Sequence, residues 1–529
     1  MKKVIIVLYL FICLSEAFTQ RNVILIIADD IGTDYFGFYE DHQDTVDVPN
    51  LRAMVNKGIR FQNAMSNPVC SSTRAGILTG RYSFRTGVGG IVGGAGGSGT
   101  LDTSEITIPR LLFTYNPFIA KANIGKWHLH QAMPVSNLVF PNVLGYNHFE
   151  GPFIGALQNY FNWTKYTNGI PGNVTNYATS ENVNNAVSWI KSQKSNPFFL
   201  WLAFNAPHDP LHLPPTGLHN FNTLSGTQAD INARPKEYYK AMIQALDHEI
   251  GRLFDSLKIL NRFDSTDFIF IGDNGNTPRT SQITNRAHTK GTVYQYGVHV
   301  PFIISGPTVV NPGRASEALV NTADLFATIT ELFEYDNWQT QIPLNKPVDS
   351  KSILPIMKNQ NSQIRPWSFC EIFSLTADSA NGKAMRNLNY KLIKFDYGKE
   401  EFYHLASDPN EAVDLLTGRL NADEINNYNY LCNEMNALVG NASFCTISVG
   451  TKIVDNTFTN RLAYPNPFSS HIYISPRIGY EQIELKNSLG QIVFSGYQFE
   501  KHDFSNLAIG IYFLKILNNS NSVIKLIKR

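Results

Sequence analysis

The chain has 529 residues, which exceeds the size at which single hydrophobic cores stop growing, so we expect two or three domains. Its 44 basic and 43 acidic residues give a formal net charge of +1, and this balance excludes a global field that would attract nucleic acid or a membrane surface. Its five cysteines are too few for a disulfide scaffold.

The first twenty residues have the pattern of a cleaved secretory signal. Two lysines, Lys2 and Lys3, precede an apolar run over residues 4–14, and small residues follow at Ser15 and Ala17. The run is too short for a transmembrane helix, and no later stretch is long and apolar enough to be one. We therefore expect an exported protein without a transmembrane segment.

Short β-branched and aromatic runs indicate buried parallel strands. They cover residues 22–28, 197–204 and 267–271, and each ends in polar residues. Some of the segments between these strands have apolar residues at helical spacing, for example residues 237–257. This alternation predicts a doubly wound α/β sheet, in which ligands bind at the carboxyl ends of the strands.

The pattern changes near residue 366. Short antiparallel strands are expected at residues 390–393 and 401–405, followed by a helix over residues 422–438. These elements predict a smaller α+β subdomain. The sequence thus divides into a signal peptide (1–20), a catalytic α/β domain (21–365), an α+β subdomain (366–447), a linker (448–460) and a terminal domain (461–529). Cys432 and Cys445 are spaced such that a disulfide and two free thiols are equally compatible with the sequence.

The terminal segment predicts a small β-sandwich, since alternating strands are punctuated by Gly490, Gly496 and Gly510. Its YPNPF start at Tyr464, its LAIGIYFLK stretch from Leu507 and its basic end resemble the C-terminal sorting domain of the type IX secretion system. The resemblance implies a Bacteroidota-type source and passage through that secretion machinery.

Carboxylates follow two of the expected strands. Asp29 and Asp30 come after the first strand, and Asp273 and Asn274 follow the strand at 267–271. An all-oxygen set suits Ca²⁺ or Mg²⁺ and not zinc. Each motif alone is also a common loop sequence, but their shared position at strand ends favours one metal site.

The segment from Pro68 to Arg81 contains the candidate nucleophile. Cys70 would lie at a helix N-terminus, where exposed N–H groups favour an anion, and Arg74 lies one turn further on. By itself, Cys70 could also be a small buried apolar residue.

This segment resembles the signature of the type I sulfatases, C-x-P-S-R-x-x-x-L-T-G. The resemblance covers about residues 21–420, and its other ordered blocks are these: Asp29-Asp30, Gly125-Lys126-Trp127-His128, Ala206-Pro207-His208, Asp273-Asn274-Gly275 and Lys290-Gly291 leading to Val300-Pro301. It implies an alkaline-phosphatase-like mixed sheet and a Cys70 converted to formylglycine by a generating enzyme.

The resemblance also implies residue roles. A single divalent ion, with Ca²⁺ favoured over Mg²⁺, would be bound by the following residues: Asp29, Asp30, Asp273, Asn274 and the modified Cys70. Arg74, Lys126 and Lys290 would neutralise the sulfuryl oxygens. His208 would protonate the departing alcohol, and His128 would take a proton from the modified residue.

The chain departs from the family pattern in two places. Ser72 replaces the usual Pro or Ala, and Thr73 replaces Ser. After Lys290, the family's Glu-Gly-Gly…Arg pattern is replaced by Gln295, Tyr296, Gly297 and His299, so altered pocket walls with intact chemistry are expected.

A secreted sulfatase acting on a sulfated algal polysaccharide, such as ulvan or carrageenan, is the leading hypothesis. The alternatives are a phosphomonoester or phosphonate hydrolase on the same scaffold, and an inactive secreted glycan-binding homologue.

Overall fold

A computed structural model describes residues 21–39, 42–94, 96–376, 379–441, 444–445, 462–475, 482–497, 499–516 and 523–529. The expected signal peptide and linker lie outside these residues. The chain divides into two compact units, Met1–Ile447 and Ser448–Arg529, each described by itself below. Among the described helices, none is long and apolar enough to cross a membrane.

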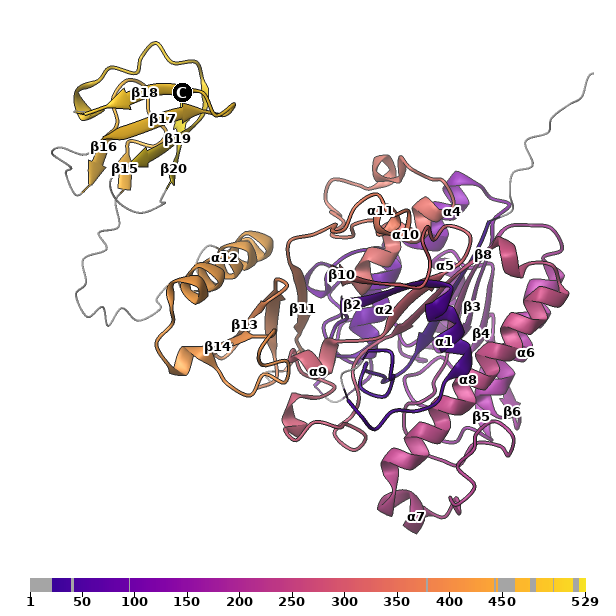
Figure 1. Ribbon diagram of the computed structural model, residues 1–529. Helices are drawn as coiled ribbons and strands as arrows, with labels where there is room; N and C mark the ends of the chain where they lie inside the picture. Colours follow the sequence, from indigo (N-terminus) through magenta and orange to yellow (C-terminus); the bar gives the residue numbers. More distant parts are fainter. Residues whose placement is uncertain are drawn as a thin grey trace, which may run out of the picture. The chain divides into compact units, whose positions relative to one another are not determined.

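The first unit is built on a ten-stranded mixed sheet with the order β10-β2-β9-β8-β1-β7-β3-β4-β5-β6 (Figure 1). Its strands are β1 (Asn22–Ala28), β2 (Gly58–Met65), β3 (Ala120–Gly125), β4 (His148–Gly151), β5 (Trp163–Thr167), β6 (Ile170–Val174), β7 (Phe198–Ala203), β8 (Thr266–Gly272), β9 (Phe302–Ser305) and β10 (Arg314–Asn321). At its centre, β1 pairs in parallel with both β7 and β8, while β9 runs antiparallel to β8 and β2. The expected doubly wound mixed α/β fold is confirmed.

Helices cover both faces of this sheet, as the continuous apolar character of β1 requires. Alternate residues of β1 contribute to two separate cores, with Leu25 in one and Ile26 in the other. The first face is covered by α2 (Cys70–Thr79), α4 (Ile108–Tyr115) and α10 (Leu325–Leu332), and the second by α1 (Pro49–Asn56), α6 (Ala178–Ser192) and α8 (Pro235–Ile259). Five further helices of this part of the unit are short: α3 (Ser83–Thr86), α5 (Phe140–Val143), α7 (Gln228–Ala233), α9 (Gln295–Val298) and α11 (Leu354–Met357).

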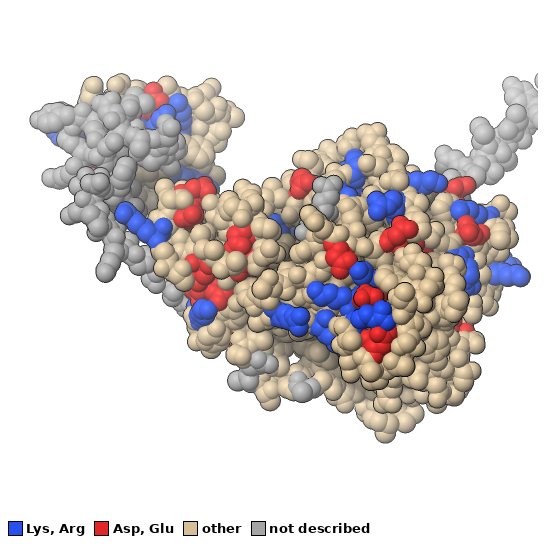
Figure 2. Space-filling model, turned by 60° about the horizontal axis from the view of Figure 1, so that its bottom comes forward, with Lys and Arg blue, Asp and Glu red and all other residues tan. Residues whose placement is uncertain are grey.

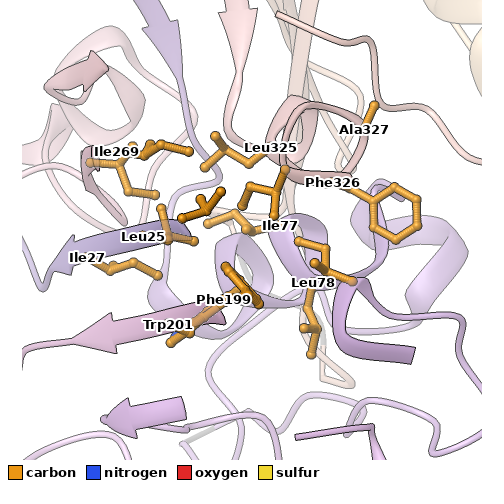
Figure 3. Close-up of a cluster of buried hydrophobic side chains, with 14 of the residues drawn as sticks. Leu25, Ile27, Ile77, Leu78, Phe199, Trp201, Ile269, Leu325, Phe326 and Ala327 are labelled. Carbon is orange, nitrogen blue, oxygen red and sulfur yellow. The ribbon is translucent and has the colours of Figure 1, made fainter. Parts of the chain in front are cut away.

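The first core fixes α2 against the sheet. Ile77 and Leu78 project from its C-terminal half toward Leu25, Phe199 and Trp201 (Figure 3). The helix ends at Gly80, which has a φ of 69° and closes against the ring of Phe326, where a Cβ would lie 2.7 Å away. Because its C-terminal end is fixed in this way, the N-terminus of α2, with Cys70, is held at a defined position.

A four-stranded antiparallel sheet forms the smaller α+β part of the first unit. Its strands are β11 (Ser368–Ile372), β12 (Gly382–Arg386), β13 (Tyr390–Phe395) and β14 (Glu400–His404), and α12 (Ala422–Val439) contacts β12 and β13. A disulfide joins Cys432 to Cys445. The second unit has β15 (Leu462–Tyr464) paired with β16 (Tyr473–Ser475), and a sheet of β17 (Ile483–Asn487), β18 (Ile492–Gly496), β19 (Gly510–Ile516) and β20 (Val523–Lys528) around one apolar core.

Glu371 of β11 should make the stability of the first unit depend on pH. Its carboxyl is fully buried, accepts a hydrogen bond from the Phe84 N–H at 2.7 Å and lies 3.5 Å from Lys383. Burial raises the pKa of Glu371 to about 7, and Lys383 offsets this only in part. The folded state therefore retains a proton that the unfolded state has lost, so the free energy of unfolding should fall by about 2–3 kcal/mol between pH 5 and pH 8.

The measurement is urea unfolding of wild type and Glu371→Gln at both pH values. The variant should be more stable than wild type at pH 8 and close to it at pH 5. The exposed Glu317→Gln is the matched control. An equal difference between Glu371→Gln and wild type at both pH values would contradict the assignment.

Candidate active site

The polar clusters predicted from the sequence meet at one edge of the large sheet. Asp29 and Asp30 follow β1, and Asp273 and Asn274 follow its parallel neighbour β8. Lys126 and His128 follow β3, and His208 follows β7, the other parallel neighbour of β1. The carboxyl ends of these parallel strands therefore bring together residues that are up to 245 positions apart.

Each buried carboxylate has a cationic partner. Lys126 Nζ lies 2.5 Å from Asp29 Oδ2, and Lys290 Nζ lies 2.5 Å from Asp30 Oδ1. Arg74 donates from Nε and a terminal nitrogen to Asp273 Oδ2, at 3.1 and 2.8 Å. Three carboxylates thus face three cations. With charges balanced in this way, the site can accept a divalent cation together with an anionic group.

Three acceptor oxygens in this cluster have no hydrogen-bond partner although they are buried: Asp29 Oδ1, Asp30 Oδ2 and Asn274 Oδ1. The Asn274 amide donates its Nδ2 to Asp30 Oδ1 at 2.8 Å, which leaves its oxygen free for another contact. Unpaired buried oxygens are costly, and a hard divalent cation is the partner that such oxygens suit. The residues present therefore fit the expected ion.

The carboxylates also repel one another. Burial and the nearby charge of Asp29 raise the pKa of Asp273 to about 6, although Arg74 opposes the shift. Burial acts to raise the pKa of Asp30, but the charges of His208, Lys290 and Lys126 lower it well below its usual value. A cation between these groups would remove the repulsion that Asp273 experiences.

Cys70 faces a histidine at the N-terminus of α2. Its Sγ lies 3.1 Å from His128 Nδ1, and the thiol is 1% exposed. Sγ also lies within 4.8 Å of ligand oxygens of Asp29 and Asp273. The side chain at position 70 is therefore placed between a proton acceptor and the oxygen cluster.

The proton state of His128 follows from its other contact. Its Nε2 lies 3.1 Å from the carbonyl oxygen of Val92, which can only accept, so Nε2 carries the proton and Nδ1 presents a lone pair to Cys70. Burial and the charge of Lys126 lower the pKa of His128 well below its usual value, which keeps the ring neutral. The Ser71 hydroxyl accepts from the Val92 N–H at 3.2 Å and holds this carbonyl in place.

These supporting contacts were not predicted from the sequence. The Val92 carbonyl lies in the glycine-rich stretch from Gly87 to Gly99, and a backbone carbonyl leaves no signature in residue identity. Ser72 and Thr73 also gain a structural role. The Ser72 hydroxyl donates to the Val69 carbonyl at 2.9 Å, and the Thr73 hydroxyl bonds Asn67. Both departures from the family motif therefore stabilise the start of α2.

Gly125 explains the glycine of the Gly-Lys-Trp-His block. It ends β3 with a φ of 98°, and a Cβ there would lie 1.9 Å from the Ala203 carbonyl oxygen. This close approach lets the Lys126 N–H donate to Ala203 at 2.8 Å, and it turns the lysine side chain toward Asp29. His128 itself has a φ of 55° and is held by a hydrogen bond from its N–H to the Phe153 carbonyl.

Gly155 should be needed for the position of His128. A Cβ at residue 155 would lie 2.3 Å from Cε1 and 2.5 Å from Nε2 of the imidazole ring. We expect Gly155→Ala to displace the ring and lower kcat by about 10²-fold or more, as loss of an acid–base group does. The measurement is the rate of sulfate release, normalised to folded protein. Gly172→Ala on the open strand β6 is the control, and equal rates for the two variants would refute this role.

His208 and Lys290 form the more accessible side of the cluster. His208 Nε2 lies 3.6 Å from Asp30 Oδ2, and the side chains of His208 and Lys290 are 17% and 13% exposed. The His208 Nδ1 proton is directed to the Asp209 carbonyl at 2.6 Å. These two residues therefore lie where a departing group would reach solvent.

The structure thus brings every predicted site residue into one cluster. By contrast, His130 is held by Trp127 and the Leu101 carbonyl, and His212 lies between the Pro210 carbonyl and the Tyr177 hydroxyl. Both histidines have structural surroundings. The two groups of potential metal ligands found among the described residues share Asp29 and so define a single site.

A candidate nucleophile at a helix N-terminus that faces a cluster of unpaired oxygens, at the carboxyl edge of a mixed sheet, is the arrangement expected of an alkaline-phosphatase-like ester hydrolase. Comparison with known proteins then gives the family. The chain belongs to the sulfatase family, whose model, described as Sulfatase, matches residues 21–335, and it is a sulfuric ester hydrolase. A model described as N-sulphoglucosamine sulphohydrolase, C-terminal, matches residues 285–438, and one described as Secretion system C-terminal sorting domain matches residues 462–529.

Curated relatives and solved structures agree with this membership. The chain is 25% identical to an arylsulfatase of Klebsiella aerogenes over 66% of this chain and 93% of that protein. It is 26% identical to human N-acetylgalactosamine-6-sulfatase over 66% of this chain and 68% of that protein. The crystal structure of Ps i-CgsB in complex with k-i-k-neocarrahexaose shares the fold, with a TM-score of 0.65 and 24% identity over 79% of this chain and 92% of that chain.

Proposed function

We propose that the chain hydrolyses sulfate esters of a sulfated glycan outside the cell, and that its substrate is ulvan or another marine algal polysaccharide. The observation that carries the proposal is the convergence of Cys70, His128 and three cations on one oxygen-lined site. A glycan substrate is supported by the human relative named N-acetylgalactosamine-6-sulfatase and by the C-terminal match to N-sulphoglucosamine sulphohydrolase.

The reacting residue in this proposal is formylglycine at position 70, produced by a formylglycine-generating enzyme. The proposed ion is Ca²⁺, with Mg²⁺ as the alternative, bound by Asp29, Asp30, Asp273, Asn274 and residue 70. When present, the modified residue supplies the attacking oxygen, and the ion supplies positive charge next to that oxygen and the sulfate group.

The side chains of this chain then perform the remaining steps. Arg74, Lys126 and Lys290 compensate the charge that develops on the sulfuryl oxygens, which is usually the largest electrostatic contribution. His128, neutral and with its Nδ1 lone pair facing residue 70, accepts a proton from that residue. His208 and Lys290, on the accessible side, hold the proton that the departing alcohol receives.

Export is the second part of the proposal. The match of residues 462–529 to a secretion-system sorting domain supports passage through type IX secretion, preceded by a signal peptide over residues 1–20 and crossing of the periplasm. We also propose that the catalytic domain ends at residue 365, the α+β subdomain at residue 447 and the linker at residue 460.

The test measures sulfate release from purified ulvan, carrageenans and their oligosaccharides, with a phosphomonoester as comparator. Mass spectrometry of the peptide containing residue 70 is made on the same preparation. Sulfate release together with an aldehyde at residue 70 is the expected result. Phosphate release without sulfate release would favour the phosphomonoester alternative, and an unmodified thiol in protein from a competent host would overturn the formylglycine mechanism.

A further inference from the structure

A cavity lies beside the catalytic cluster, between the large sheet and the four-stranded sheet of the same unit. It has a volume of about 400 Å³, in the range of sites that bind small molecules. Its wall includes Asn63 of β2, Arg386 of β12 and Asn410 after β14. None of the residues assigned to the catalytic site lines it. We call it the Arg386 cavity.

Three of the positions at which the chain departs from the family pattern lie in this wall. Gln295, Tyr296 and His299 all line the Arg386 cavity, and they replace residues of the Glu-Gly-Gly…Arg pattern. These departures thus line a cavity that no residue of the catalytic cluster lines, and Lys290 contacts Asp30 outside it.

Arg386 is the cationic group of the cavity, and its wall also contains the carboxylate of Asp34. It is 4% exposed and donates to Asn63 Oδ1 at 3.1 Å, to Gln295 Oε1 at 3.4 Å and to the carbonyls of Asn387 and Leu388. Every one of these acceptors is neutral, and over the described residues Arg386 makes no ion pair. Burial lowers the pKa of Arg386 to about 10, although the charge of Glu411 opposes the shift, so the guanidinium is still cationic at neutral pH.

The nearby carboxylates are already occupied. Glu411 lies 2.8 Å from Lys391, and it accepts from the Gln295 N–H. Asp34 accepts from Asn276 Nδ2 at 2.7 Å and from the Tyr296 hydroxyl. Glu411, which Lys391 already neutralises, still acts on Arg386 through its charge. The hydrogen-bond partners of the guanidinium are all neutral, so its charge is only partly compensated, and a bound anion would complete the compensation.

The rest of the wall suits a sugar. Amide side chains of Asn63, Gln295 and Asn410 offer hydrogen bonds to hydroxyls, and the rings of Tyr296 and His42, 5.7 Å apart, offer apolar surface. Over the face shown in Figure 2, acidic and basic side chains are interspersed. Affinity for an anion must therefore come from a local arrangement such as the one around Arg386.

We propose that the Arg386 cavity is a second carbohydrate site, which binds a hexose unit bearing a carboxylate or a sulfate. That the ligand is a sugar rests on the proposed function, whereas its negative charge is inferred from Arg386 itself. Such a site would hold an acidic unit of a glycan independently of ester hydrolysis at residue 70.

The test is calorimetric binding to the full-length Cys70→Ala protein, so that turnover cannot contribute. Glucuronate, glucose 6-sulfate and glucose are the probes, and the first two distinguish a carboxylate from a sulfate. We expect one or both anionic sugars to bind. Glucose should bind with an affinity at least about tenfold lower, because it lacks the charge-assisted hydrogen bond to Arg386.

Two added substitutions assign the binding to the cavity. Arg386→Met keeps the apolar stem and removes the charge, while Asn410→Trp adds bulk at an exposed position of the wall and leaves the buried network intact. Each should weaken the anionic sugars by at least about tenfold. Arg52→Met, on the exposed face of α1, is the matched control and should bind as the parent does.

The outcomes separate this proposal from the proposed function. Unchanged affinity in folded Asn410→Trp, or no binding of either anionic sugar by the parent at millimolar concentration, would overturn the second site even if the wild-type enzyme releases sulfate. Loss of binding in Asn410→Trp supports the site even if Arg386→Met fails to fold. If the cavity binds the anionic sugars but the wild-type enzyme releases no sulfate, the result counts against the proposed function alone.

Discussion

Replacing Cys70 with alanine is expected to lower the rate of sulfate release by about 10⁴-fold or more, because removal of a nucleophile leaves only the binding and electrostatic contributions of a site. Sγ of Cys70 is the atom that lies between His128 Nδ1 and the oxygen cluster, so no neighbouring side chain can take its position. The measurement is sulfate release by folded protein, accompanied by the mass of the peptide that contains residue 70.

Cys370 provides the matched control for this substitution. It is the other free cysteine among the described residues, it is completely buried in β11, and burial raises the pKa of its thiol to about 12. Cys370→Ala should therefore retain activity while losing a comparable volume of buried side chain. Activity in folded Cys70→Ala near that of Cys370→Ala would show that the nucleophile is misassigned.

The central strands could be predicted because burial on both faces leaves a strong signal in the sequence. The run at residues 22–28 became β1 with the same bounds, and the run at 267–271 became β8 with one residue added at each end. The order of the ten strands could not be predicted in this way. The antiparallel position of β9 between β8 and β2, for example, depends on contacts between segments far apart in the chain.

More of the candidate site than of the surrounding fold could be predicted from the sequence, because the chemistry of the site depends on particular side chains that occur in ordered blocks. Cys70, Asp273 and Lys290 were found by motif, and the structure places them in one cluster. The features of the site that the sequence did not reveal are a backbone contact and the absence of a side chain. The Val92 carbonyl orients His128, and the absence of a side chain at Gly155 leaves room for its ring.

The Cys432–Cys445 pair illustrates a different limit. A spacing of 13 residues is compatible with a bridge or with two thiols. The choice is made by tertiary structure, since α12 holds Cys432 and the Asn436 amide bonds the backbone of Cys445 at 2.8 and 3.1 Å. Neither contact can be inferred from the spacing of the two cysteines in the sequence.

Substitution of Asp273 by asparagine is expected to remove most of the response to a divalent cation. Asp273 Oδ1 accepts from the Asp30 N–H, and Oδ2 accepts from Arg74, so the change leaves a buried guanidinium without its carboxylate and removes a negative charge from the oxygen cluster. We expect kcat/KM to fall by about 10³-fold, comparable to the loss of a preorganised electrostatic group.

Thermal unfolding gives a readout that is independent of activity. An ion that binds only the folded state stabilises it, so wild type should unfold at a lower temperature after treatment with EDTA and should recover with Ca²⁺ or Mg²⁺. The ion that restores both stability and sulfate release at the lower concentration is the preferred one. In Asp273→Asn the unfolding temperature should change little with EDTA or added ion.

Asp267→Asn is the control because it changes the same residue type near the other end of β8, the strand that Asp273 follows. Asp267 is buried, accepts from the Thr308 hydroxyl and N–H at 2.7 and 3.1 Å, and lies away from every catalytic residue. It should keep both activity and the response to ions. An ion response in Asp273→Asn equal to that of wild type would mean that the three unpaired oxygens of Asp29, Asp30 and Asn274 bind the cation without Asp273. Absence of any ion response in wild type would mean that the cluster serves only the cationic side chains that contact it.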